Sequence, residues 1–288
     1  MLPVLAAVLH LALSQGETDT TVAVRQGQRL DFSNFGGSVV VKTWRQNAIR
    51  VRANHSSRAR IQVSTDGPRV SIEARGRHGR ALVDYDILAP TWMAVSVQGS
   101  PESEVTIEGT EAEVSVETVE GAIRVVGGRG NISLHSVEGD VTLEGAQGHI
   151  EVNTVDGSIR LKNCTGDIRA ETVDGDVMLE EIESADVSVG SVDGGISYAG
   201  TLKDGGRYRF QTHDGDLDIA VPERTNATVS VATFDGILDA SFPLPLKGKT
   251  KHRSSFTLGS GSARIELESF DGTIRLRRPN EMTQRKEE

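Results

Sequence analysis

The chain has 288 residues and a formal net charge of −10, from 41 acidic and 31 basic residues, and only 4% of its residues are aromatic. This length suits one large domain or two modest ones. Past the N-terminus, no apolar stretch approaches the roughly 18 residues that a membrane span requires. The single cysteine, Cys164, excludes an internal disulfide and a cysteine-based zinc cluster.

Charge is divided unevenly along the chain. Residues 101–240 carry 28 acidic and 9 basic residues, net −19, whereas residues 1–100 carry net +5 and residues 241–288 carry net +4. The acidic middle repels nucleic acid and anionic glycans. No dense stripe of Lys and Arg with interleaved aromatic residues is present, so no nucleic-acid partner is expected.

The N-terminus is typical of a signal peptide. Leu2 to Leu13 is apolar apart from His10, and Ala12-Leu13-Ser14 offers small residues for cleavage before Gln15. We therefore predict a signal peptide over residues 1–14 and an exported protein, periplasmic or at the cell surface. The alternative is a buried first strand. No Lys or Arg precedes Arg25, which departs from the usual signal pattern.

Residues 15–100 contain short apolar runs without a regular period. Val39 to Ala53 predicts two strands around a polar turn, and Val83 to Ser100 predicts two strands on either side of Pro90. We interpret this segment as an N-terminal β region, either a sandwich-like layer or the first imperfect coils, that caps the rest of the chain. Trp44 and Trp92 are interpreted as core or cap residues, with sugar-stacking platforms as the alternative.

An acidic residue followed by glycine recurs through residues 101–277. The spacings between these glycines are 18, 18, 18, 19, 21, 21 and 36 residues. The last gap represents either two coils or one coil with the insertion PLPLKGKTKHRS. The predicted turn glycines are Gly121, Gly139, Gly157, Gly175, Gly194, Gly215, Gly236 and Gly272.

Each repeat reads as strand, turn, strand, turn. In the unit from Gly148 to Leu161, apolar and polar residues alternate with period two. Two short strands cannot bury a core alone, but stacked coils can. The sequence therefore predicts an all-β fold, a right-handed single-stranded parallel β-solenoid (β-helix) of 18–21-residue coils. Eight coils would span about 40 Å at a strand spacing of about 4.8 Å.

Alignment of the coils places like residues together. Cys164 aligns with Ala146 and Ile182, which predicts a small core residue rather than a catalytic thiol. One predicted inward slot contains Ile132, Ile150, Ile168 and Val187. A second predicted inward slot contains Val119, Val137, Val155, Val173, Val192, His213, Phe234 and Phe270.

The acid–glycine pair is interpreted as turn chemistry. Glycine supplies the positive φ of a tight corner, and the acid solvates the surface. The alternative is a ladder of calcium sites, but calcium-binding rolls repeat Gly-Gly-x-Gly-x-Asp, and this chain has only Gly127-Gly128-Arg129-Gly130-Asn131, once. We therefore predict no metal site and no cofactor. The tail, residues 278–288, is charged and is predicted to be disordered.

These features resemble the bacterial "putative adhesin" family of β-strand-repeat proteins. The resemblance rests on DYDILAPTWMAVSVQGS, on the step from an early β segment into the coils, and on units such as LKNCTGDIRAETVDGDVMLEEI. It covers about residues 38–276. It implies a single-stranded β-helix at or outside the cell envelope and brings no catalytic residues.

Two functions are compatible with these patterns. The first is a non-enzymatic envelope scaffold, adhesin-like or binding module, with an unknown envelope protein or glycan as its partner. No catalytic residues are predicted for it, because nucleophilic triads, phosphate loops and HExxH motifs are absent.

The alternative is a glycan-active β-helix enzyme, a polysaccharide lyase or hydrolase. Glycoside hydrolysis needs two carboxylates about 5 to 9.5 Å apart in a cleft. The early coils, from Val114 to Val177, contain no aromatic residue that could stack on a sugar. The densest acidic patch, interpreted as a solvated edge, is Asp214, Asp216, Asp218, Asp235 and Asp239.

Overall fold

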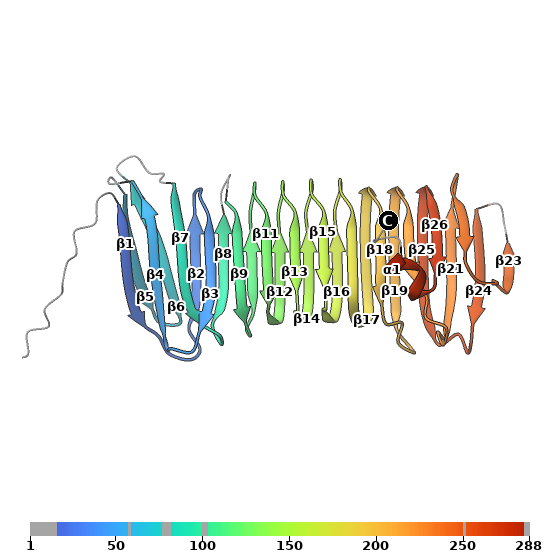
Figure 1. The fold of residues 1–288 in the computed structure, drawn as a ribbon, viewed down its shortest axis with the longest axis horizontal. Helices are drawn as coiled ribbons and strands as arrows, with labels where there is room; N and C mark the ends of the chain where they lie inside the picture. Colours follow the sequence, from blue (N-terminus) through green and yellow to red (C-terminus); the bar gives the residue numbers. More distant parts are fainter. Residues whose placement is uncertain (1–15, 57–58, 77–81, 100–102, 250–251, 285–288) are drawn as a thin grey trace, which may run out of the picture.

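The computed structural model describes residues 16–56, 59–76, 82–99, 103–249 and 252–284. Over these residues the chain forms an elongated all-β rod in which strands lie side by side along the long axis (Figure 1). Successive coils contribute one strand to each of two faces, and the strands on either side of a turn belong to different faces. The signal peptide predicted for residues 1–14 lies outside the described residues.

One face, which we call face A, is a continuous row of hydrogen-bonded strands. From the N-terminal end of the rod its members are β1 (Glu17–Ala23), β4 (Ala48–His55), β7 (Val83–Pro90), β3 (Val39–Trp44), β9 (Val105–Thr110), β11 (Ile123–Gly127), β13 (Val141–Glu144), β15 (Ile159–Lys162), the first part of β17 (Val177–Asp193), β18 (Ile196–Gly200), β20 (Leu217–Ala220), β26 (Thr273–Arg277) and β22 (Ile237–Ala240).

The other face, face B, runs alongside in the same direction. Its members are β5 (Ala59–Asp66), β6 (Arg69–Gly76), β2 (Arg29–Asn34), β8 (Ala94–Gly99), β10 (Val114–Glu117), β12 (Arg129–His135), β14 (Gln147–Asn153), β16 (Thr165–Glu171), the second part of β17, β19 (Arg207–Asp214), β25 (Ala263–Asp271), β21 (Ala227–Thr233), β24 (Arg253–Leu258) and β23 (Leu246–Lys249).

Like residues pair from coil to coil, as the repeat predicts. Ile150 lies opposite Ile132 on one side and Ile168 on the other, all in parallel register. The isoleucine side chains are buried, and the residues that flank each isoleucine along its own strand are not. The buried residues of both faces form one contiguous apolar core, so the stack as a whole buries what a single coil cannot.

The second predicted inward slot is wrong by one residue. Val155 and its equivalents are about half exposed, between 41% for Val119 and 51% for Phe234. Thr154, the residue before Val155, is buried instead, because the alternation of buried and less buried residues continues from Ile150 through Val152 to Thr154. Apolar character suggested a core position, but the phase of the strand places these side chains outside the corner.

Small hydroxyl residues occupy the inner side of that corner. Thr172 donates to the carbonyl oxygen of Gly157 in the preceding coil at 3.0 Å, and Thr212 donates to that of Gly194 at 2.9 Å. A carbonyl that is partly shielded from water needs a partner, and a threonine hydroxyl supplies one without filling the narrow corner. The buried residues of this row are Thr118, Ser136, Thr154, Thr172, Ser191, Thr212 and Ser269.

Coils at both ends of the rod stack out of sequence order. The strands β25 and β26, last along the chain, lie between β19/β20 and β21/β22. At the other end, β2 and β3 lie between β6/β7 and β8/β9. The 36-residue gap is therefore one coil with an insertion, which forms β23 and the antiparallel β24.

Part of the tail predicted to be disordered is a short helix, α1 (Pro279–Gln284). Proline suits the first helical position because its ring fixes a helical φ. The carboxylate of Glu281 accepts the backbone N–H of Arg278 at 3.0 Å, which caps the helix start. The Arg278 guanidinium lies 4.0 Å from the Phe242 ring centroid and donates to the Val221 carbonyl. Composition alone missed these local contacts.

Candidate functional site: an acidic turn edge and an aromatic groove

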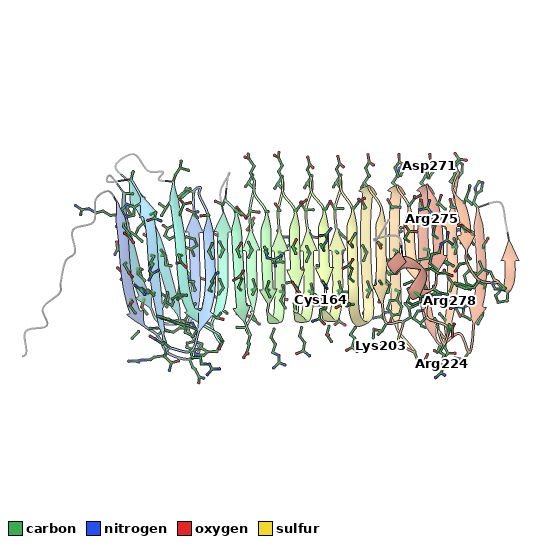
Figure 2. The ribbon with its side chains drawn as sticks, viewed as in Figure 1. Cys164, Lys203, Arg224, Asp271, Arg275 and Arg278 are labelled. Atoms are coloured by element: carbon green, nitrogen blue, oxygen red, sulfur yellow. The ribbon has the colours of Figure 1, made fainter. Side chains whose placement is uncertain are left out.

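The acid–glycine turns form one long edge of the rod. The acids pair in register from coil to coil, and Asp271 at one end of the row points outward from the upper edge in Figure 2. Their side chains are exposed. The row consists of Glu120, Glu138, Asp156, Asp174, Asp193, Asp214 and Asp271.

The glycines of this edge combine two constraints. Seven of the eight have a positive φ, and Gly157, with φ at 152°, is an example. A Cβ on Gly157 would also collide with the carbonyl of Gly139 in the preceding coil. Gly236 is the exception in conformation, since its φ is not positive, but a Cβ there would meet the carbonyl of Gly272. The corner therefore needs glycine for close stacking as well as for its backbone conformation.

No metal centre is assembled within the described ranges. There, no group of three or more His, Cys, Asp or Glu side chains is arranged to hold a metal ion. The acids of the edge contribute one carboxylate per coil, whereas calcium takes six to eight oxygens. The absence of a metal and of a cofactor remains a prediction.

The acidic patch near residues 214–239 is split between two surfaces. Asp214 and Asp235 lie on the exposed turn edge. On face A, Arg275 pairs with Asp216 at 2.6 Å and with Asp218 at 3.7 Å. Asp239 is paired in turn with Arg277. The interpretation of a solvated edge therefore fits Asp214 and Asp235 alone, because the other three carboxylates lie on face A and are paired with arginines of a neighbouring strand.

Asp216 has a defined structural role. Its Oδ1 accepts the backbone N–H of Thr273 at 2.7 Å, as Asp140 accepts that of Ser158 and Asp176 that of Gly195. Burial pushes the pKa of the Asp216 carboxyl upward, but the bonds from Thr273 and Arg275 outweigh it and hold the pKa below its usual 3.8.

Four rings continue the valine row at the C-terminal end of the edge. His213, Phe270, Phe234 and His252 stack face to face, with centroid separations of 4.8, 5.0 and 4.5 Å and interplanar angles below 10°. This order differs from the sequence order because β25 lies between β19 and β21. The ring faces therefore cover one another, and the ring edges point outward.

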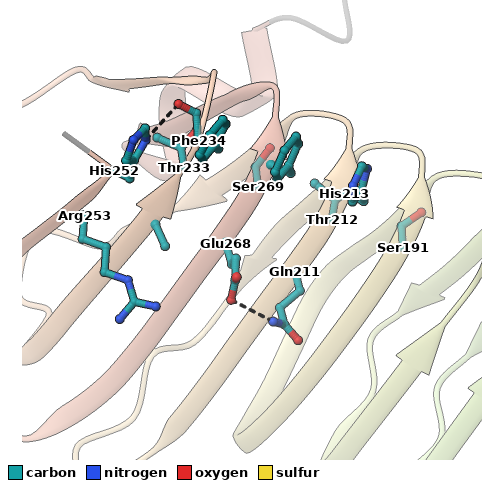
Figure 3. A pocket seen from close by; sticks show the side chains of 12 residues that line it. Ser191, Gln211, Thr212, His213, Thr233, Phe234, His252, Arg253, Glu268 and Ser269 are labelled. Carbon is teal, nitrogen blue, oxygen red and sulfur yellow. Dashed lines mark hydrogen bonds between the residues drawn. The ribbon is translucent and has the colours of Figure 1, made fainter.

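A groove of about 440 Å³ lies beside this stack on face B (Figure 3). Its outward row contains Gln211, Glu268, Ala232 and Arg253 on four adjacent strands. Gln211 donates to the Glu268 carboxylate at 2.9 Å. The groove thus combines ring edges, one carboxylate, one amide and one guanidinium within the size range of small-ligand sites.

His252 is held in one tautomer. Its Nδ1 lies 3.1 Å from the Phe234 carbonyl oxygen, and a carbonyl can only accept. Nδ1 therefore carries the proton, and the Phe234–His252 ring pair is fixed from both the ring face and the backbone. Sequence reasoning aligned His213, Phe234 and Phe270 but missed His252, because His252 belongs to the insertion rather than to a repeat.

Cys164 is buried in the core beside Ala146 and Ile182. Its thiol contacts the Lys162 carbonyl at 3.3 Å, and burial raises the pKa of the thiol. Both features suit a small core side chain and oppose a nucleophile, which requires an accessible thiolate. The tryptophans are partly buried and bonded, with Trp44 Nε1 donating to the Ala48 carbonyl at 2.7 Å.

None of the helices formed by the described residues is long and apolar enough to cross a membrane. Among curated proteins, none matches this chain.

Several solved structures are similar to it at low identity. One is a putative adhesin from Parabacteroides distasonis, 10% identical, with 91% of this chain and 98% of that chain covered and a TM-score of 0.40. Another is a putative adhesin from Bacteroides fragilis, 11% identical, with 91% and 98% covered and a TM-score of 0.37. A putative cell adhesion protein from Clostridium sporogenes is 10% identical, with 92% and 99% covered and a TM-score of 0.24.

The family model described as "Toastrack DUF4097" matches residues 27–277, which include every strand of the rod from β2 to β26 and leave out β1. The resemblance to a family of β-strand-repeat proteins is thereby confirmed. This chain belongs to the Toastrack DUF4097 family.

Proposed function

We propose that this chain is a non-enzymatic, exported β-solenoid of the cell envelope that acts as a scaffold or adhesin-like binding module. The observation that carries the proposal is the row of half-exposed rings beside the groove on face B. Other large aromatic side chains, such as Tyr198 and Phe210, are fully buried. Exposed aromatic residues beside convergent polar groups are typical of binding surfaces.

The same groove gives little support to the alternative, a glycan-active enzyme. Glu268 contributes the one carboxylate of the described groove lining, and it is hydrogen bonded to Gln211. Glycoside hydrolysis by the usual route requires a pair of carboxylates. Binding without turnover is the function that this set of groups supports best.

We infer that residues 1–14 are a signal peptide, that residues 15–100 cap a solenoid of residues 101–277, and that the coils wind right-handed. Export is tested by mass spectrometry of protein purified from its native cells. Gln15 or a close neighbour is expected at the N-terminus, and an intact Met1 on cytoplasmic material would rule export out.

Binding is tested by co-sedimentation of the purified chain with envelope fractions of its native cells. Saturable binding is expected, and it should be lost in the double variant Phe234→Ala, Phe270→Ala. Phe35→Ala is the matched control, because Phe35 is 43% exposed at the other end of the rod. Non-saturable binding, or equal loss in the control, would contradict the proposal. Release of sugar reducing ends by the wild type would favour the enzyme.

A further inference from the structure

The floor of the groove is a single small side chain. Ala232 on β21 lies opposite Glu268 on β25 and opposite Arg253 on β24. The backbones of the two flanking strands are about 9 to 10 Å apart, which is twice the strand spacing. Elsewhere in this outward row Asn153, Glu171 and Gln211 have long or amide side chains, and Gly190, between Glu171 and Gln211, leaves a second gap that does not line the groove. The depression is therefore one strand wide, with an acceptor on one flank and donors on the other.

The wall above this floor is made of ring edges. Because the faces of Phe270 and Phe234 are covered by their neighbours in the stack, neither is available to a ligand. An aromatic ring is electron-poor at its edge and electron-rich on its face. The wall therefore favours oxygen atoms, and an apolar side chain of a partner would find no ring face to cover.

Strand pairing excludes one common mode of peptide binding. β21 is hydrogen bonded to β25 on one side and to β24 on the other, so a peptide cannot add to it as a new strand. An amphipathic helix needs an apolar groove, and this groove is lined by Gln211, Glu268 and Arg253. A ligand must therefore be recognised through hydrogen bonds to side chains.

We propose that this groove binds a neutral, hydroxyl-rich oligosaccharide, with one sugar ring over Ala232 between Glu268 and Arg253. Each hydroxyl of a sugar can donate or accept, so one hydroxyl of the ring can donate to the carboxylate while another accepts from the guanidinium. The Glu268 carboxylate beside Ala232 disfavours a carboxylated or sulfated glycan at this position, as does the net charge of −19 over residues 101–240, which supply seven of the twelve lining residues. The other five lining residues, among them Arg253, belong to residues 241–288, which carry net +4. This inference rests on the proposed function, since it names the ligand class of the same binding surface.

The test begins with a printed array of neutral, carboxylated and sulfated oligosaccharides. A neutral oligosaccharide that binds is then titrated into the purified chain by calorimetry. Ala232→Gln fills the depression, and we expect at least a tenfold loss of affinity. Ser188→Gln is the matched control, because Ser188 is also a small outward residue of face B but does not line the groove. It should change affinity less than twofold.

A second pair of variants tests the flanking groups. Glu268→Gln should weaken the same oligosaccharide at least fivefold. Glu171→Gln is its control, since Glu171 occupies the same outward row three strands away and pairs with Arg169. Both variants keep the side-chain volume. Their thermal unfolding should match that of the wild type, which separates binding from folding.

Three results would overturn the inference. One is binding of anionic glycans alone, and another is equal loss in the filled and control variants. The third is binding of no glycan, while a peptide library shows contacts at Ala232 by NMR; this result would leave a binding module with a different ligand. If the wild-type chain also fails to co-sediment with envelope fractions, the proposed function itself is contradicted.

Discussion

The carbonyl oxygen of Gly121 lies 2.5 Å from the point where a Cβ on Gly139 would stand, one coil further along the turn edge. Gly157 stacks on Gly139 in the same way, and Gly175 stacks on Gly157. The edge is therefore a column of glycine backbones in which no side chain can be inserted without separating two coils.

Substitution of Gly157 should be strongly destabilising. Gly157→Ala combines a φ of 152° with a backbone collision, so we expect a loss of about 3 kcal/mol or more. Gly157→Val should lose more, and the exposed Asp156→Asn should stay within about 0.5 kcal/mol. Urea unfolding of the purified chain measures these differences.

Two control glycines distinguish the two causes of the stability loss, the positive φ and the backbone collision. Gly145 has a φ of 70° and open space around its Cβ position, so Gly145→Ala should cost only about 1 to 2 kcal/mol. Gly236→Ala tests the collision without a positive φ. Equal losses at Gly145 and Gly157 would show that stacking contributes nothing.

The hydroxyl row inside the corner should contribute to stability. Thr172→Val keeps the shape but removes the donor to the partly buried Gly157 carbonyl, and we expect a loss of about 1 to 2 kcal/mol. Thr142→Val is the control, since Thr142 points outward from β13. The stabilities of the two variants are compared through their urea midpoints, provided that the dependence of the unfolding free energy on urea concentration is unchanged. A loss of equal size in both variants would show that the hydroxyl bond is not the cause.

The pair between Asp216 and Arg275 should make stability depend on pH in acid. Because the folded-state pKa of Asp216 lies below 3.8, its contribution is complete well above pH 3.8 and is lost as pH falls through the folded pKa. Asp216→Asn should therefore lower the melting temperature at pH 7, and the difference from wild type should shrink below about pH 4.

Asp140→Asn is the matched variant for this measurement. Asp140 accepts a backbone N–H in the same way, from Ser158, but takes part in none of the ion pairs found among the described residues. Its effect should be smaller at pH 7. A pH-independent difference for Asp216→Asn would contradict the assigned role of its charge.

Truncation after Ser262 should also unfold part of the chain that remains. It deletes β25 and β26, which lie inside the stack, and leaves β21 and β22 without their parallel partners. Limited proteolysis should then cleave within residues 221–262, while the central coils stay protected. A chain ending at Arg278 is the control, because it loses α1 but keeps every strand. Protection of residues 221–262 in the shorter chain would show that β25 and β26 do not lie inside the stack.

The sequence by itself determined the repeating part of the fold. An acid–glycine pair every 18 residues and strict alternation around Ile150 were enough to predict stacked parallel strands, because each coil can bury its apolar face only against the next. The role of Cys164 as a core residue followed from its alignment with Ala146. These inferences depend on local phase and period, which one sequence displays directly.

Only the tertiary structure decided how the ends close and where the groove lies. The stacking of β25 between β19 and β21 brings Phe270 between His213 and Phe234, and the antiparallel β24 adds His252 and Arg253. A periodic sequence does not encode which coil stacks on which, because successive coils present nearly equivalent edges. The stacking order, at this end and for β2 and β3 at the other, is therefore a property of the assembled stack.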